Sequence, residues 1–220
     1  MTNKLDQTVK AVRRNWRLQA TISILAICGL YLSLPERLTL GPTWLLPAAV
    51  ILLLIPTIVF HRAGRHTLNF VFGIAVLAII TTGLMFALGF LISGLPSKRQ
   101  PPKDLLTSAA ALWICNVLVF ASWYWRLDAG GPHIRESRRS HINGAFLFPQ
   151  MMLPEGSAYA DSTWRPDFID YLFLAFNTST AFSPTDVPVL GRWAKVLMMV
   201  QSSISLATVA ILAARAINIL

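Results

Sequence analysis

Charged residues are scarce in this chain of 220 residues, at 13% of the total. A soluble domain usually carries about 25% charged residues, so this chain lacks the side chains needed to cover a water-facing surface. Hydrophobic residues make up 55% instead. The composition excludes an ordinary soluble domain and predicts an all-α, polytopic transmembrane helical bundle.

Cysteines and catalytic motifs are also sparse. The two cysteines, Cys28 and Cys115, lie inside apolar runs, which excludes a disulfide framework and favours small packing residues. The chain has no glycine-rich phosphate loop and no two histidines four residues apart. His133, Glu136 and His141 only loosely resemble metal-ligand spacing. We therefore predict no enzymatic activity, no metal and no cofactor, and rank an intramembrane enzyme third among the functions considered.

Basic residues outnumber acidic ones by 19 to 10, for a net charge of +9. They lie at the edges of apolar runs, where they act as topology signals and contact anionic lipids. The predicted partner is therefore the lipid bilayer and not nucleic acid. Residues 1–17, 61–67 and 126–170 hold 5, 2 and 5 basic residues, and the loops on the opposite side hold four, namely Arg37, Lys98, Arg99 and Lys103. This bias predicts that these three segments are cytoplasmic.

Six windows without a charged residue locate the membrane segments. They are Leu18–Pro35, Leu38–Phe60, Thr67–Ser97, Leu105–Trp125, Tyr171–Thr185 and Val196–Ala214. Five are long enough for the roughly 20 apolar residues that a spanning helix needs. Tyr171–Thr185 has only 15 residues, so it is either a marginal sixth span or a re-entrant half-helix. The chain then divides into a four-span region (1–125), a polar loop (126–170), and a short helix, polar turn and final transmembrane helix (171–220).

Two smaller patterns also predict packing. Gly83 and Ala87 are four residues apart inside an apolar run, which is typical of close helix contacts in membranes. The segment FLFPQMML (146–153) is too apolar for free solvent, so we expect it to fold back onto the bundle.

The strongest functional pattern is DYLFLAFNTSTAFSPTD (170–186), which is followed by a long apolar helix. Its order of short helix, threonine-rich turn, aspartate and long helix resembles the pore module of two-span potassium channels. The resemblance places Thr180 among the filter threonines and Asp186 at the closing aspartate. Ser183-Pro184-Thr185 stands where the filter has Gly-Tyr-Gly, and Pro184 fixes φ near −65°. We therefore expect no potassium selectivity.

The final helix carries polar residues on one face. At 100° per residue, Gln201, Ser205 and Thr208 lie within a narrow sector of the helix. Such a face either forms interhelical hydrogen bonds or lines a water-filled path. Asn116, in the middle of the fourth long window, is expected to bond a neighbouring helix.

Four stretches resemble a family of uncharacterised bacterial integral membrane proteins. They are WRLDAGGP (125–132), FLFPQ (146–150), AFNTSTAFSPTD (175–186) and RWAKVLMMVQSSISL (192–206). The resemblance implies a multi-pass protein of the bacterial inner membrane and implies no activity.

The sequence thus favours a channel-related or pore-like protein with a degenerate filter-like turn. The alternative is a non-conducting structural or regulatory membrane protein. The pore-like residues are Asn177, Thr178, Thr180, Ser183, Thr185, Asp186, Gln201, Ser205 and Thr208. One copy of such a turn does not enclose a pore, so this prediction also implies a homo-oligomer.

Overall fold

The computed structural model describes residues 18–94, 101–138, 144–154, 164–182 and 186–217. The elements are a helix at Leu18–Leu32, η1 (Glu36–Leu38), α2 (Leu45–Arg62), α3 (His66–Gly94), α4 (Pro102–Leu127), η3 (Asp128–Gly130), α5 (Pro132–Ser137), η4 (Pro149–Met151), α6 (Phe168–Thr180) and α7 (Arg192–Ile217). Within the described residues there is no β-strand, only an isolated antiparallel bridge between Phe146 and Val189. The all-α prediction is confirmed.

Four helices, α2, α3, α4 and α7, are long and apolar enough to cross a membrane. Their length and composition are consistent with the membrane class predicted from the sequence. Leu18–Leu32 is apolar but shorter over its described residues. The prediction of five spans and a sixth short segment therefore remains a proposal beyond these four helices.

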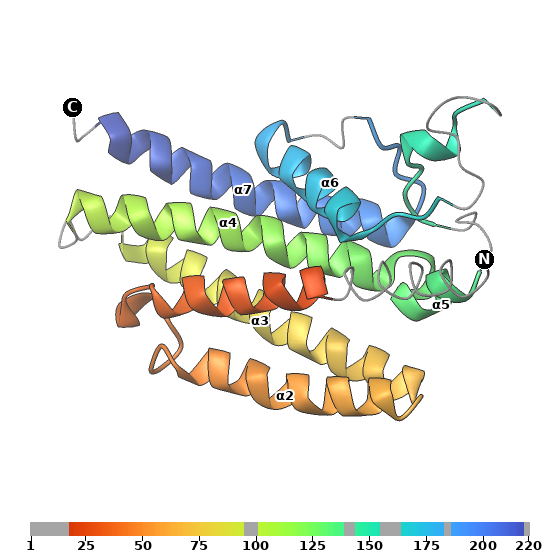
Figure 1. Cartoon of the computed structure of the whole chain (residues 1–220). Coiled ribbons are helices and arrows are strands. Elements are labelled where there is room, and N and C mark those ends of the chain that lie inside the picture. The colour runs from red at the N-terminus through yellow and green to blue at the C-terminus, as the bar shows by residue number, and fades with distance from the viewer. Residues whose placement is uncertain (1–17, 95–100, 139–143, 155–163, 183–185, 218–220) are drawn as a thin grey trace.

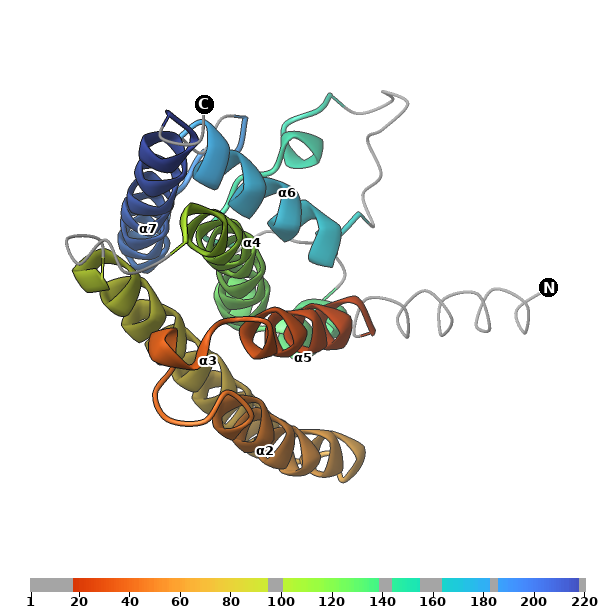
Figure 2. The same ribbon diagram turned by 90° about the vertical axis from the view of Figure 1, so that its left-hand side faces the viewer.

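Helix α4 lies at the centre of the bundle, between α3 on one side and α6 and α7 on the other (Figures 1 and 2). It is the most buried of the four long helices, and α2 is the least buried. The predicted close contact at Gly83 and Ala87 is confirmed. Ala87 is fully buried, and a Cβ at Gly83 would overlap the side chain of Leu46 on α2. Small residues on α3 therefore allow α2 to pack closely.

The two ends of the bundle carry different loops. Leu18, His61, His66 and Trp125 line one cavity, so the starts of the first helix and α3 and the ends of α2 and α4 lie at the same end. At the other end Arg37 forms an ion pair with Asp104 at 3.5 Å. Residues 61–67 and the start of 126–170 therefore lie at the same end of the bundle, as a common side requires. Residues 1–17 lie outside the described part of the chain.

The short helix α6 does not lead directly into α7 at the far end. After α6, Leu147 N–H donates to Pro188 O at 2.9 Å and Leu190 N–H donates to Ala145 O at 2.8 Å. The same loop contacts the start of α6, where the rings of Phe148 and Tyr171 are 5.4 Å apart. The chain therefore returns to the end of the bundle where α6 began, and α7 starts there (Figure 1). The start of α6 and the start of α7 therefore lie at the same end of the bundle.

Part of the apolar segment FLFPQMML packs as expected. Phe146 and Phe148 are buried, and Phe146 lies against Tyr124, Tyr171 and Trp193. The expectation is wrong for the end of the segment, because Met152 and Leu153 are exposed. The aromatic half therefore anchors the loop.

Candidate functional site

The structure separates the pore-like residues into two groups. Thr178, Gln201, Ser205 and Thr208 are buried within the chain. Asn177 is half-buried, and Thr180 and Asp186 are exposed. Ser183 and Thr185 lie outside the described residues.

Gln201 on α7 is the centre of the buried group. Its Nε2 donates to Ala175 O at 2.7 Å and to Ser179 Oγ at 2.8 Å, both on α6. Its Oε1 accepts a hydrogen bond of 2.5 Å from the Tyr124 hydroxyl on α4. Asn116 Nδ2, also on α4, donates to the backbone carbonyl of Gln201 at 3.1 Å. We call Asn116, Tyr124, Ser179 and Gln201 the glutamine node; it joins three helices.

The neighbouring hydroxyls on the same face of α7 are also used inside the protein. Ser205 Oγ donates to Ser179 O at 2.8 Å, which ties α7 to the last turn of α6. Thr208 donates to carbonyls of its own helix, at 3.0 Å to Ile204 O. Thr178 does the same on α6, at 2.8 Å to Leu174 O. These groups need no water, because protein acceptors satisfy their donors.

The outward face of α6 is apolar. Ile169, Phe173 and Phe176 are exposed at helical spacing, so the surface that α6 presents is suited to lipid. A water-filled path along this face would need polar side chains instead. Within α6, the exposed polar residue is Thr180, in the last turn of the helix.

A buried corner holds the end of α4 against the loop and α6. The carboxylate of Asp128 is fully buried and accepts hydrogen bonds from the Tyr171 hydroxyl at 2.6 Å and from Ala145 N–H at 2.5 Å. Buried Arg135 donates to the carbonyls of Trp125 and Asp128, both at 2.8 Å. Its guanidinium carbon lies 5.1 Å from the centre of the Tyr171 ring. The segment WRLDAGGP (125–132) therefore forms a turn whose buried polar groups are bonded within the protein.

Glycines make this corner possible. Gly130 and Gly131 have φ of +84° and +94°, a left-handed region that residues with a Cβ rarely adopt. A Cβ at Gly131 would also meet the carbonyl of Arg126 at 3.0 Å. These two glycines therefore allow the chain to change direction sharply after α4.

Asp167, just before α6, and Asp170, in its first turn, together cap that helix. Asp167 Oδ1 accepts from the N–H groups of Ile169 and Asp170, and Asp170 Oδ2 accepts from Asp167 N–H at 2.7 Å. This reciprocal pair is a capping box. Burial raises the pKa of Asp170 to about 6; the hydrogen bond from Asp167 N–H lowers it, and the Asp167 charge raises it.

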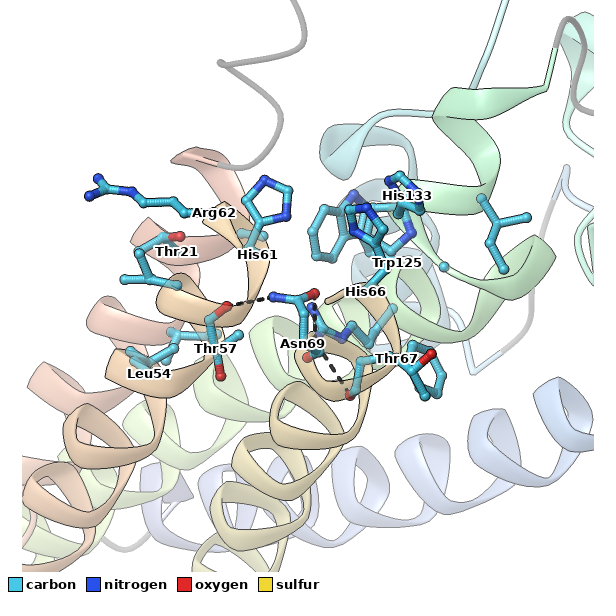
Figure 3. A pocket seen from close by; sticks show the side chains of 18 of the residues that line it. Thr21, Leu54, Thr57, His61, Arg62, His66, Thr67, Asn69, Trp125 and His133 are labelled. Carbon is cyan, nitrogen blue, oxygen red and sulfur yellow. Dashed lines mark hydrogen bonds between the residues drawn. The ribbon is translucent and has the colours of Figure 1, made fainter. Parts of the chain in front are cut away.

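A cavity of about 930 Å³ lies at the same end of the bundle as the corner. Its walls come from the first helix, the end of α2, the start of α3, the end of α4 and α5 (Figure 3). Leu18, Ile24, Leu54 and Ile58 supply apolar lining. The polar lining consists of His61, Arg62, His66, Asn69, Arg126 and His133, together with Thr21, Thr57 and Thr67. The volume lies within the range of small-molecule sites.

Two histidines that are 67 positions apart in the sequence meet in this cavity. The rings of His66 and His133 are stacked, with centroids 3.3 Å apart and an angle of 11° between them. Within the described residues no three His, Cys, Asp or Glu side chains are grouped to hold a metal ion. His141 and the side chain of Glu136 lie outside what the structure describes. The His133–Glu136–His141 spacing is thus untested as a metal site.

Sequence reasoning did not identify the cavity. The basic flank at 61–67 and the arginines after Trp125 were interpreted as topology signals, and their charge pattern was the available clue. No protein-family model, curated protein or solved structure matches this chain. The resemblances to a bacterial membrane family and to a channel pore module therefore remain predictions.

Proposed function

We propose that this chain is a non-conducting membrane protein, structural or regulatory, in which α4, α6 and α7 form a locked polar core. The proposal rests on the environment of the Gln201 side chain. Both ends of its side-chain amide are hydrogen-bonded within the chain, and the residue is fully buried. A pore-lining glutamine would face water instead.

The re-entrant course of α6 supports the same proposal. A helix of 13 residues is about 20 Å long, which is shorter than the roughly 30 Å hydrocarbon core. Non-helical backbone at that depth must be surrounded by protein or water. Here the last turn of α6 is bound to α7 by Ser205 and Gln201. The protein itself therefore supplies the polar partners.

A pore assembled from several chains is the second candidate. It rests on the exposure of Thr180, the last residue of α6, and of Asp186 in the segment that follows, where the resemblance to potassium channels places filter residues. These residues would line a path only if copies of the chain converged on one axis. The apolar outward face of α6 favours the non-conducting proposal over this one.

For location, we propose the bacterial inner membrane, with five spans, re-entrant α6 and a cytoplasmic N-terminus. The proposal follows the family resemblance and the basic bias of 61–67 and 126–170. The C-terminus would then lie outside, because α6 returns to the side on which it started. Reporter fusions after residue 140 and at the C-terminus test this topology. Reporter activity on the same side at both positions would contradict it.

Ion flux in liposomes tests the function. The purified protein is reconstituted with a potassium- or sodium-sensitive dye inside the vesicles, alongside Asp186→Asn and protein-free vesicles. We expect no flux above the protein-free vesicles for either protein, with gramicidin as the positive control. Flux through the wild type that falls in Asp186→Asn, from a protein that purifies as an oligomer, would support the pore instead.

A further inference from the structure

The cavity at the end of the bundle has one sign of charge. Among the described residues, its lining contains Arg62, Arg126 and three histidines and no aspartate or glutamate. The guanidinium of Arg126 is held in place, because it donates to the carbonyls of Asn69 and Phe70 and lies 5.8 Å over the Phe70 ring. A fixed cation in a partly buried wall attracts anions more strongly than a solvated one.

The start of α3 adds to this field. His66 is the first residue of a 29-residue helix, so the positive end of the helix dipole faces the cavity. The Nδ1 atom of His66 is buried and has no hydrogen-bond partner within the described chain. Buried polar atoms are almost always paired, so this nitrogen indicates a site for a ligand.

The remaining lining is apolar and comes from two helices of the membrane region. Leu18 and Ile24 belong to the first helix, and Leu54 and Ile58 belong to α2. The outer faces of these helices are apolar too, with Ile22, Leu52 and Ile55 exposed. A cavity that joins such a wall to a cationic end fits a molecule with an anionic head and a hydrocarbon tail.

We propose that this cavity binds an anionic phospholipid. The phosphate lies near Arg126, His66 and His133, and one acyl chain lies between the first helix and α2. Cationic pockets between membrane helices on the cytoplasmic side bind anionic headgroups in this way. The lipid would hold α5 and α3 together across the stacked His66 and His133 rings. The proposal does not depend on whether the protein conducts ions.

Binding is tested on the full chain in neutral detergent. Dioleoyl phosphatidylglycerol, dioleoyl phosphatidylcholine and inorganic phosphate are added separately, and the thermal midpoint and native mass spectrum are recorded. We expect phosphatidylglycerol alone to raise the midpoint and to remain bound as one molecule per chain. An equal rise of the midpoint with phosphatidylcholine would overturn the proposal. An equal rise with inorganic phosphate alone would overturn it too.

Variants locate the site. His133→Ala combined with Arg62→Ala removes an imidazole and a guanidinium from the lining, and circular dichroism checks that the variant folds. We expect phosphatidylglycerol to bind this variant at least about tenfold more weakly, as the loss of a charge-assisted contact to phosphate implies. Arg65→Ala is the control, because Arg65 is an exposed cation in the same loop that does not line the cavity.

A separate variant tests the part of the cavity proposed to hold the acyl chain. Ile58→Trp fills the apolar half and leaves every charge in place, so it should reduce phosphatidylglycerol binding to a similar extent. If Arg65→Ala weakens binding as much as the double variant does, general surface charge explains the effect and the proposal fails. Unchanged binding in both cavity variants would also overturn it.

Discussion

The hydroxyl of Tyr124 on α4 donates a 2.5 Å hydrogen bond to Oε1 of Gln201 on α7, and both residues are fully buried. The other end of the same amide donates to Ala175 O and Ser179 Oγ on α6. One side chain therefore connects the central helix α4, the short helix α6 and the final helix α7. In hydrocarbon, such bonds stabilise the packed state because no water replaces them.

Replacing Gln201 with leucine should loosen this core. The change leaves the Tyr124 and Ser179 hydroxyls without their partner, and we expect a free energy of unfolding lower by about 1–4 kcal/mol, since interhelical bonds contribute about 0.6–2 kcal/mol each. Unfolding in sodium dodecyl sulfate, followed by tryptophan fluorescence, measures it. Ser203→Ala, an exposed position on the same helix, is the control. Equal stability of the two variants would contradict the role assigned to Gln201.

Asp128 and Tyr171 should behave as a coupled pair. Tyr171→Phe leaves a buried carboxylate oxygen without its 2.6 Å donor, so we expect a loss of about 1–3 kcal/mol. In an Asp128→Asn background the same change should cost clearly less, because the charge that the hydroxyl served is gone. A double-mutant cycle measures this coupling. Strictly additive losses would show that the hydrogen bond does not hold the corner.

Acidification should strengthen the start of α6. Burial raises the pKa of Asp170 from 3.8 to about 6, so the folded protein binds this proton more tightly than the unfolded chain. The contribution of Asp170 to the free energy of unfolding is therefore fully present below pH 3.8, and it is lost as the pH rises through about 6. Thermal midpoints of wild type and Asp170→Asn between these pH values test it. The variant should lack this part of the slope; identical slopes would refute the assignment.

Two glycines on α3 should respond in opposite ways to alanine. A Cβ at Gly73 would overlap the guanidinium of Arg126, whereas nothing lies within 4 Å of a Cβ at Gly89. We expect Gly73→Ala to destabilise the protein by about 1–3 kcal/mol through overpacking. Gly89→Ala should be neutral or more stable by up to about 1 kcal/mol, because alanine favours helix. Thermal unfolding of both variants checks this, and equal midpoints would show that Arg126 moves freely.

The periodicity of α7 predicted which residues turn away from lipid. It did not predict which groups these residues bond. Gln201, Ser205 and Thr208 share a sector because a helix repeats every 3.6 residues. Their partners depend on tertiary packing: Asn116 lies 85 positions before Gln201. Both alternatives, hydrogen bonding and a water path, therefore fitted the same pattern.

The short helix and the cavity were harder for related reasons. A 15-residue uncharged window fits either a marginal span or a half-helix, and the contacts of 145–148 with 188–190, which support the half-helix proposal, depend on the fold. Likewise, His66 and His133 appeared as isolated residues beside basic loops. Only the fold brings their rings to 3.3 Å, because the corner after α4 turns α5 back toward α3.

The most direct test of the locked core is the water accessibility of Ser179 and Ser205. Each is replaced by cysteine in a chain whose native Cys28 and Cys115 have been changed to alanine, and a membrane-impermeant thiol reagent is applied from either side. We predict no labelling at 179 or 205 until the protein is denatured, while the exposed Ser137→Cys control is labelled in the folded state. Rapid labelling of 179 and 205 in the folded protein would show that water reaches α6 and α7 and would contradict the non-conducting account.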